Sequence, residues 1–349
     1  MSEKTVIIRC RVNNEIGFGH LVRSRVLGKK LLELGYKTIL VGPSRKYMND
    51  DDKTIFHEWI ERESWIDSPT EAEFHVELAK TYGAKHMIMD DYRSDYKHQV
   101  LLRKARLKTL QQYDASKPQR FAADLVINGS PYEKREFYEP NLYSKDIQML
   151  HGPKYAILRS EFFSSYLSSI KKENKVLITF GGGDDRGAMI HVLNELEGYM
   201  PKNWSFVLVM GTHNPNIEEV KDWIKKHPTQ NVELLVNPDN MPEVIASCKL
   251  AILSGGTTTF EAAHLGTPAI LVPIAENQYN QGKGWAELGA MIYLGPYNVL
   301  PQNVLRDMLL ELMKNPILID NMCTICQQNV DGLGTERILN TLLNKGEIK

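Results

Sequence analysis

The sequence predicts an α/β protein of two domains, each built on a parallel sheet. The chain has 349 residues, more than one hydrophobic core usually serves. Short apolar runs alternate along it with segments of helical periodicity, a pattern typical of parallel-sheet domains. The second half also repeats the plan of the first, because each half opens with a strand, a glycine-bearing loop and a helix.

The first domain is expected over residues 1–168. Val6–Val12 forms its first strand, and apolar residues recur at helical spacing from His20 to Leu34, where Gly35 ends the helix. The acidic run Asp50-Asp51-Asp52 is expected to be a solvated surface turn. The other expected elements are a strand at 38–41, a loop with an irregular helix at 44–68, a helix at 71–82, a strand at 86–89, a helix from about 95, and strands near 107–110 and 124–127.

The second domain is expected over residues 175–349, after a polar connector at 168–174. It begins with a strand at 176–180, a glycine-rich turn at 181–185 and a helix from about 188. Further buried strands are predicted at 205–210, 232–236, 250–253 and 269–273. Open α/β sheets bind ligands beyond the carboxyl ends of their strands, so we expect the site in a cleft between the domains.

Composition excludes several classes of function. A formal net charge of −1 argues against bulk nucleic-acid or membrane-surface binding. No stretch approaches the roughly 18 uncharged apolar residues of a membrane span, and the apolar run near the N-terminus is too short for a signal peptide. A cytoplasmic protein is expected, as a monomer or a weak dimer.

Four cysteines are too few for a disulfide framework in a chain of this length. The spacing Cys323-x-x-Cys326 can hold zinc or support redox chemistry. Because no second cysteine pair or nearby histidine completes a zinc site, packing thiols are the preferred interpretation, and no metal is expected.

A glycine loop follows the first strand and carries the first chemical motif. Gly17 and Gly19 allow a tight turn and let a ligand approach main-chain N–H groups. His20 then lies at a helix N-terminus, where the helix dipole disfavours an imidazolium, so a neutral imidazole able to accept a proton is expected. The spacing lacks the third glycine of a dinucleotide site.

The run from Ser254 to Glu261 carries the second motif. It offers backbone N–H groups and hydroxyls to phosphate oxygens without any lysine, which suits a diphosphate at a helix N-terminus. Glu261 lies where a carboxylate can accept both hydroxyls of a ribose. The alternative is a capped helix with threonine at the N-cap and glutamate at the third position, and both interpretations can hold together.

Three further polar segments follow predicted strands. The glycines of 181–183 can bring the backbone against a pyrophosphate or sugar, and the polar run 275–281 can hydrogen-bond sugar hydroxyls or amides. A solvated loop is the alternative for the latter. Asp90-Asp91-Tyr92 brings carboxylates to the cleft edge; because no third metal ligand is evident, substrate contact is preferred over a metal site.

With these motifs the chain resembles the UDP-2,4-diacetamido-2,4,6-trideoxy-β-L-altropyranose hydrolases of pseudaminic-acid biosynthesis. More distantly it is similar to nucleotide-sugar glycosyltransferases of the GT-B fold. The resemblance implies a GT-B-like fold, in which two Rossmann-like parallel-sheet domains face each other across a cleft. The matching segments occur in order along the chain: 16–20 with Arg23, 152–162, 181–184, 254–261 and 276–278.

The resemblance implies hydrolysis of a UDP-sugar without metal or cofactor. Water would attack the anomeric carbon with inversion, and the freed amino sugar would feed synthesis of a nine-carbon sugar for flagellin or surface polysaccharide. His20 would be the base and Asp91 its catalytic companion at the sugar. The residues expected to bind the nucleotide sugar are Gly17, Gly19, Arg23, Tyr92, Gly182, Gly183, Gly256, Thr257, Thr258, Glu261, Glu276, Asn277 and Gln278.

Two other functions stay open on the same motifs. A glycosyltransferase would share the fold and the UDP-sugar donor and differ in its acceptor. A catalytically silent nucleotide-sugar-binding module would keep the phosphate loops and lose the base, and the presence of His20 counts against it.

Overall fold

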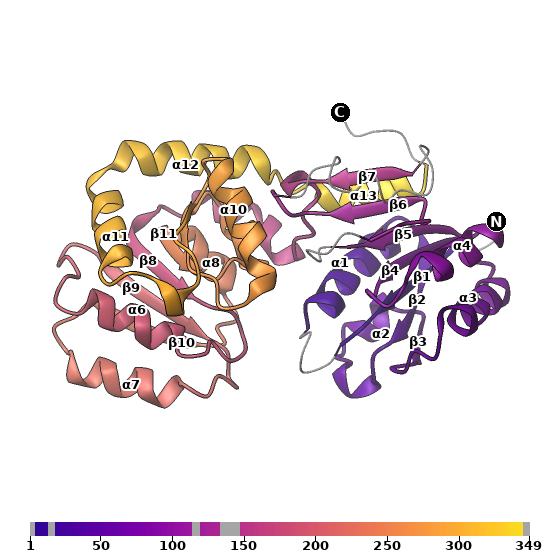
Figure 1. The fold of residues 1–349 in the computed structure, drawn as a ribbon, viewed down its shortest axis with the longest axis horizontal. Coiled ribbons are helices and arrows are strands. Elements are labelled where there is room, and N and C mark those ends of the chain that lie inside the picture. The colour runs from indigo at the N-terminus through magenta and orange to yellow at the C-terminus, as the bar shows by residue number, and fades with distance from the viewer. Residues whose placement is uncertain (1–3, 13–17, 114–118, 133–146, 345–349) are drawn as a thin grey trace. The chain divides into compact units, whose positions relative to one another are not determined.

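The computed structural model describes residues 4–12, 18–113, 119–132 and 147–344 (Figure 1). The chain divides into two compact units, one of residues 1–159 with 332–349 and the other of residues 160–331. These bounds differ from the expected 1–168 and 175–349, because the last helix, α13 (Gly334–Leu342), packs on the first unit. Each unit is described by itself below.

The first unit contains a seven-stranded sheet in which every neighbouring pair is parallel. Its spatial order is β3-β2-β1-β4-β5-β6-β7, so the direction of strand addition reverses between β1 and β4. Such a reversal is where open sheets hold ligands. The strands are β1 (Lys4–Cys10), β2 (Tyr36–Gly42), β3 (Glu58–Glu61), β4 (His86–Asp90), β5 (Lys108–Gln112), β6 (Leu125–Asn128) and β7 (Gln148–His151).

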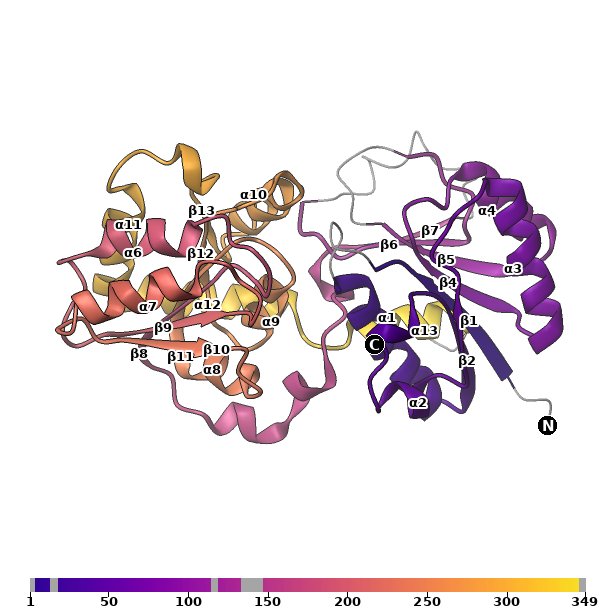
Figure 2. The ribbon, with the colours of Figure 1, turned by 90° about the horizontal axis from the view of Figure 1, so that it is seen from below.

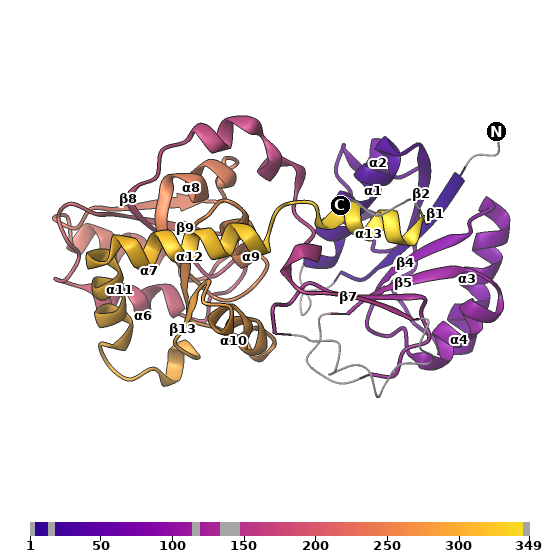
Figure 3. The same ribbon diagram turned by 90° about the horizontal axis from the view of Figure 1, so that it is seen from above.

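Helices cover both faces of this sheet (Figure 2). On one face α1 (Gly19–Glu33) and α13 pack against apolar side chains of the central strands, together with the residues beside α2 (Asp52–Ile55). On the other face lie α3 (Ser68–Tyr82) and α4 (Tyr96–Lys104). Figure 3 shows α13 beside α1, where the Lys108 ammonium donates to the carbonyls of Thr341 and Leu342 at the end of α13. Burial of the central strands on both faces explains the apolar residues Val6, Ile7 and Ile8 of β1, which lie next to the buried charged Arg9.

The second unit contains a six-stranded parallel sheet with the order β10-β9-β8-β11-β12-β13. Here the reversal lies between β8 and β11. No helix in the described parts of the chain is long and apolar enough to span a bilayer. The elements are β8 (Glu173–Thr179), α6 (Ala188–Leu196), β9 (Ser205–Met210), α7 (Ile217–Lys226), β10 (Val232–Val236), α8 (Met241–Ser247), β11 (Cys248–Leu253), α9 (Thr258–His264), β12 (Ala269–Leu271), α10 (Tyr279–Glu287), β13 (Ile292–Tyr293), α11 (Val304–Lys314) and α12 (Pro316–Asn329).

The segment 44–68 differs most from its expectation. It contributes an edge strand, β3, paired with β2, where a loop and an irregular helix were expected. Asp52 is completely buried, so the prediction of a solvated acidic turn is wrong for this residue. Its carboxylate accepts two hydrogen bonds of 2.8 Å from the Arg25 guanidinium of α1, which ties the segment to the core.

Two other expectations need correction. β10 has the predicted bounds, but it is an edge strand with exposed and half-buried positions, not a buried strand. The strands β7 and β13 were not predicted.

Candidate active site

The reversal point of the first sheet holds a buried cluster of charged residues. His20 lies in the first turn of α1 and is only 5% exposed. Its Nδ1 lies 2.7 Å from the Oδ1 atom of Asp90 and 2.9 Å from the backbone oxygen of the same residue. Arg23, one turn further along α1, donates from two guanidinium nitrogens to the two carboxylate oxygens of Asp90, both at 3.0 Å. The register of the sheet creates this meeting, because Asp90 ends β4 opposite Cys10 of β1.

The contacts of Asp90 determine its charge. Burial raises the pKa of Asp90, but Arg23 and His20 outweigh burial and hold that pKa at about 2. Asp90 is therefore a carboxylate at neutral pH. Because both groups facing the Nδ1 atom of His20 are hydrogen-bond acceptors, we assign the ring proton to Nδ1, which leaves the lone pair on Nε2. This is the arrangement by which a carboxylate orients a histidine base.

Other predicted residues of the first unit lie around this cluster. The ring of Tyr92 packs edge-on against His20 with 5.1 Å between centroids. Gly19 is the first residue of α1, and a methyl group there would meet no atom within 4 Å. Gly17 lies outside the described residues. Arg23, predicted to bind the nucleotide sugar, forms an ion pair with Asp90.

Asp91 lies in a different environment from the one predicted. Its side chain is 0% exposed, and its carboxylate accepts hydrogen bonds from Arg9 at 3.2 Å and from Arg93 at 2.7 and 2.9 Å. The pKa of Asp91 is raised by burial and lowered by these two arginines, with a net decrease. The prediction of a catalytic Asp91 in contact with sugar is therefore wrong: successive residues of a strand point to opposite faces, and it is Asp90 that faces His20.

Glycines form the reversal point of the second sheet. Gly182 and Gly183 follow β8, are exposed, and would meet no atom within 4 Å if each carried a methyl group. Asp185 next to them is buried, and its carboxylate accepts from the backbone N–H of Gly187 and of Met189 at the start of α6. The Asp185 carboxylate thus stabilises the end of the glycine turn, while Gly182 and Gly183 stay exposed.

A second glycine loop follows β11. Gly255 has φ +100°, a conformation that favours glycine. The Gln281 amide donates to the carbonyl of Gly256 and to the hydroxyl of Thr259, both at 2.9 Å. The indole N–H of Trp285 donates to the same hydroxyl at 3.0 Å. Two residues of α10 therefore fix this loop: Gln281, which belongs to the polar run predicted at 275–281, and Trp285, which the sequence analysis did not identify.

The remaining predicted residues gather around that loop. Thr257 is exposed and Thr258 begins α9 half-buried. Gln278, in the short 3₁₀ helix Glu276–Gln278, accepts from the backbone N–H of Ile274 at 2.9 Å, and its amide nitrogen lies beside Gly256. Glu276 and Asn277 are exposed. The capped-helix alternative has no support from Thr257, whose side chain makes no capping hydrogen bond within the described residues.

Glu261 and the cysteine pair complete the set of predicted residues. Glu261 lies in α9 and is buried. Cys323 and Cys326 lie on α12, where the thiol of Cys326 is buried and donates to the Ala290 carbonyl at 3.3 Å. Within the described ranges no three histidine, cysteine, aspartate or glutamate side chains group closely enough to hold a metal ion.

Comparison with known proteins places these features in a family context. Residues 171–327 match the model of the glycosyltransferase family 28 C-terminal domain. The chain is 25% identical to the spore coat polysaccharide biosynthesis protein SpsG of Bacillus subtilis, over 93% of both chains. It is 23% identical to the UDP-2,4-diacetamido-2,4,6-trideoxy-β-L-altropyranose hydrolase of Campylobacter jejuni, over 81% of this chain and 97% of the relative. The resemblance to this hydrolase family is confirmed.

Two further comparisons concern the extent of the match and the fold. The chain is 27% identical to the uncharacterized protein MJ1062 of Methanocaldococcus jannaschii over 74% of its length, and this match spans only 53% of that longer relative. The crystal structure of Acinetobacter baumannii MurG superposes with a TM-score of 0.70 at 14% identity, covering 98% of this chain and 99% of the other. The fold is GT-B-like, as predicted, and the family 28 match lies within the unit that carries the glycine loops.

Proposed function

We propose that this protein hydrolyses a UDP-linked diacetamido-trideoxyhexose at the anomeric C–O bond, releasing UDP and the free amino sugar for nonulosonate biosynthesis of the pseudaminic-acid type. The observation that carries the proposal is the buried pair of His20 and Asp90, with Nδ1 of the ring 2.7 Å from the carboxylate. Relatives named as hydrolases of such a substrate support the choice of reaction.

In the proposed reaction His20 accepts a proton from water through Nε2. The water oxygen then forms a bond to the anomeric carbon, the C–O bond to the diphosphate breaks, and its electron pair stays on the UDP oxygen. Asp90 stabilises the imidazolium, and Arg23 keeps Asp90 ionised. Asp90 is thus a positioning residue, since it acts through His20.

Charge develops on the departing diphosphate, so catalysis needs donors there. We assign this role to the open backbone N–H groups at Gly182, Gly256 and Thr257, where no side chain obstructs approach to Gly182. Glu261 would accept the ribose hydroxyls. Asn277 and Gln278 would contact the sugar, with Tyr92 packed on the base. The reaction as proposed uses no metal or cofactor.

A glycosyltransferase is the second candidate, and the match to the family 28 domain favours it. Both reactions start from the same donor and use a general base. They differ in the nucleophile, which is water in one and an acceptor hydroxyl in the other.

UDP release from a panel of UDP-amino sugars, with no acceptor added, tests the proposal. The wild type is expected to release one UDP per free sugar. His20→Asn should reduce the rate by about 10²- to 10⁴-fold, the usual contribution of a general base. His57→Asn, an exposed histidine of the same unit, should match the wild type. UDP release that requires an acceptor would establish the transferase, and binding without any release would leave only a binding module.

A further inference from the structure

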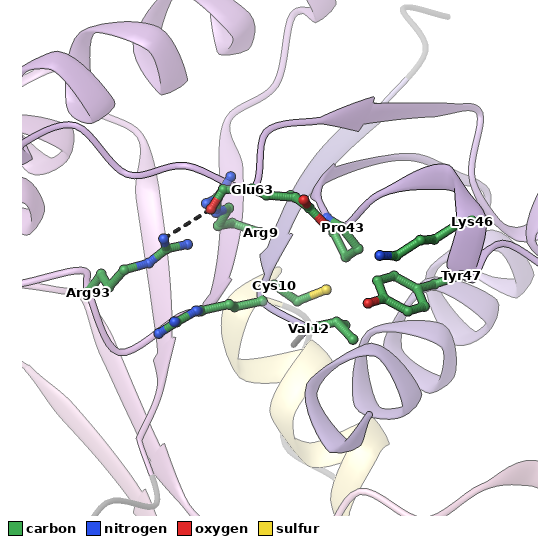
Figure 4. Close-up of a pocket in the computed structure, with 10 residues that line it drawn as sticks. Arg9, Cys10, Val12, Pro43, Lys46, Tyr47, Glu63 and Arg93 are labelled. Atoms are coloured by element: carbon green, nitrogen blue, oxygen red, sulfur yellow. Dashed lines mark hydrogen bonds between the residues drawn. The ribbon is translucent and has the colours of Figure 1, made fainter. Parts of the chain in front are cut away.

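A pocket of about 480 Å³ opens at the carboxyl ends of β1 and β2 in the first unit (Figure 4). Its size falls in the range of small-molecule sites. Neither His20 nor Asp90 lines it, so it is separate from the proposed catalytic pair. We call it the basic pocket, because its charged lining residues are Arg9, Arg11, Lys46, Arg93 and one acid, Glu63.

The two arginines that flank the pocket share one counterion. Arg9 and Arg93 both bond to the carboxylate of Asp91, so the buried triad keeps an excess positive charge. Arg9 is 0% exposed, and its buried Nη2 atom has no hydrogen-bond partner within the part of the chain that the structure describes. Burial is the main cause that lowers the pKa of Arg9, because removing the charged guanidinium from water costs free energy. An anion in the pocket would offset that cost.

The other two cations are even less compensated. In the described parts of the chain, neither Arg11 nor Lys46 has an acidic partner. Glu63 lines the same pocket and offsets one of these charges, and its carboxylate also accepts from the backbone N–H of Ser44. It is the Glu63 backbone carbonyl that accepts from Arg93, at 3.0 Å. Four cations therefore surround the pocket, while the acids near them among the described residues are Glu63 on the lining and Asp91 and Glu71 beside Arg9.

Hydrogen bonds from Arg25 hold the backbone of the segment that carries Lys46. Lys46 and Tyr47 belong to the short helix Arg45–Tyr47, and their ammonium and hydroxyl point from it toward Cys10 and Pro43 (Figure 4). Arg25 donates to the Tyr47 carbonyl at 2.9 Å while it also binds the buried Asp52. The segment 44–68 is thus held in place as a wall of the pocket, and the ammonium does not depend on a free loop for its position.

We propose that the basic pocket binds a carboxylate or phosphate group carried by a sugar-sized ligand, at a site distinct from that of the UDP diphosphate. The arginines supply planar donors that suit such groups. Tyr47, Val12 and Pro43 supply a hydroxyl and apolar surface for the remainder of the ligand. This proposal does not depend on the proposed hydrolysis, and it gives Asp91 a role: it positions two arginines of an anion site.

Amide NMR of the full chain tests the proposal without turnover. The probes are methyl β-D-glucuronide and inorganic phosphate, with methyl β-D-glucoside as the neutral match, at constant ionic strength. The two anions are expected to shift the amides of Val12, Gly42 and Tyr47 saturably, whereas the glucoside should not. The double variant Arg11→Gln with Lys46→Gln should weaken anion binding about tenfold or more, since each charge-assisted hydrogen bond contributes that much. Lys53→Gln, an exposed lysine away from the pocket, is the matched control.

Several results would overturn the proposal. One is an equal response to the glucoside, and another is undiminished binding by the double variant. A third is no response to either anion. Saturating UDP provides the last arm: if UDP shifts the same amides and displaces the glucuronide, the pocket is the nucleotide's own site and no second anion site exists. Because binding alone is measured, a failure of the hydrolase proposal would leave these outcomes unchanged.

Discussion

The two reversal points of the molecule have opposite chemistry. In the first sheet, between β1 and β4, titratable side chains meet: His20 and the buried carboxylate of Asp90, with the half-buried guanidinium of Arg23. In the second, between β8 and β11, the loops carry Gly182 and Gly256, and a methyl group at Gly182 would meet no atom within 4 Å. The same topology therefore carries titratable side chains in one unit, where we propose an acid–base centre, and glycine loops in the other, where we propose a site of backbone donors.

The difference follows from what each task requires. A proton acceptor needs a fixed tautomer and a desolvated counterion, which only packed side chains provide. A diphosphate carries its own charge and needs many donors at close approach, which glycine-rich loops at helix starts provide. Variants at the reversal point of the first sheet should therefore change kcat and leave the Kd for UDP unchanged. Variants at the reversal point of the second sheet should change the Kd for UDP.

The largest effect is expected from Asp90→Asn. An amide can present its N–H to Nδ1 of His20, which favours the wrong tautomer and leaves the imidazolium without its anion. The rate constant kcat should fall by about 10²- to 10⁴-fold, with the acid limb of the pH–rate profile moved to lower pH. UDP binding by calorimetry should stay unchanged, because the phosphate loops belong to the other unit.

Asp124→Asn is the matched control for that variant, because Asp124 is a partly exposed aspartate of the same unit whose guanidinium contact with Arg103 is as long as 4.0 Å. It should keep wild-type kcat. If Asp90→Asn keeps its activity and pH profile, the assignment of His20 as a carboxylate-oriented base is incorrect, whatever the stability of the variant.

A pH effect should also distinguish the two units. In the first unit Nδ1 of His75 lies 3.1 Å from Nε2 of His98, with Ser94 bonded to the far side of His98. Burial lowers the pKa of His98 from 6.5 to about 4, and burial with the neighbouring His98 lowers the pKa of His75 well below 6.5. Both histidines are thus neutral when folded.

The sign of the effect follows from proton uptake on unfolding. Between pH 6.5 and about 4 the unfolded chain binds protons that the folded chain does not, so the free energy of unfolding falls as pH falls. The slope is at most about 1.4 kcal/mol per pH unit for each histidine. Asp90 changes the free energy of unfolding only at lower pH, because its pKa is 3.8 in the unfolded chain and about 2 in the folded one. Amide exchange should show β1 and β4 losing protection in this window while β8 and β11 keep theirs.

His75→Phe should reduce that slope, and His57→Asn should leave it unchanged; His86, whose pKa burial also lowers, contributes to the part that remains. Equal loss of protection in both sheets would show that the histidine pair does not set the acid stability of the first unit.

Much of this fold was predictable because parallel strands are marked locally. β9 and β10 have their predicted bounds, and α3 and α4 begin near the predicted positions, since apolar periodicity and capping residues are short-range signals. β3 was missed because four residues, Glu58–Glu61, at a sheet edge carry no clear alternation. Asp52 was taken as exposed because its partner Arg25 lies far back in the sequence.

The site shows the same division between local and distant information. His20 was identified from its glycine loop and helix start, both of which are local. The choice between Asp90 and Asp91 depends on which way each side chain points at the end of β4, and a shift of one residue reverses that direction. Trp285, and the contact of Gln281 with Gly256, were not predicted because both depend on a loop that lies across an intervening strand.

The smallest effect, and the sharpest test of the second reversal point, is expected from Gly182→Ala. The added methyl group would meet no protein atom within 4 Å, so the free energy of unfolding should change by less than about 0.5 kcal/mol. The same methyl group would stand where a diphosphate approaches the backbone, so the Kd for UDP should rise about tenfold, a loss of about 1.4 kcal/mol.

Gly255→Ala would behave differently, because φ is +100° and the new atom would lie 3.3 Å from the Gln278 carbonyl oxygen; it should destabilise the unit by about 1–2 kcal/mol. Gly129→Ala in the first unit, at an ordinary 3.8 Å from Ala156, should alter neither quantity. If Gly182→Ala binds UDP as tightly as the wild type, the open backbone after β8 does not hold the diphosphate, and the contrast between the two reversal points reduces to the loop after β11.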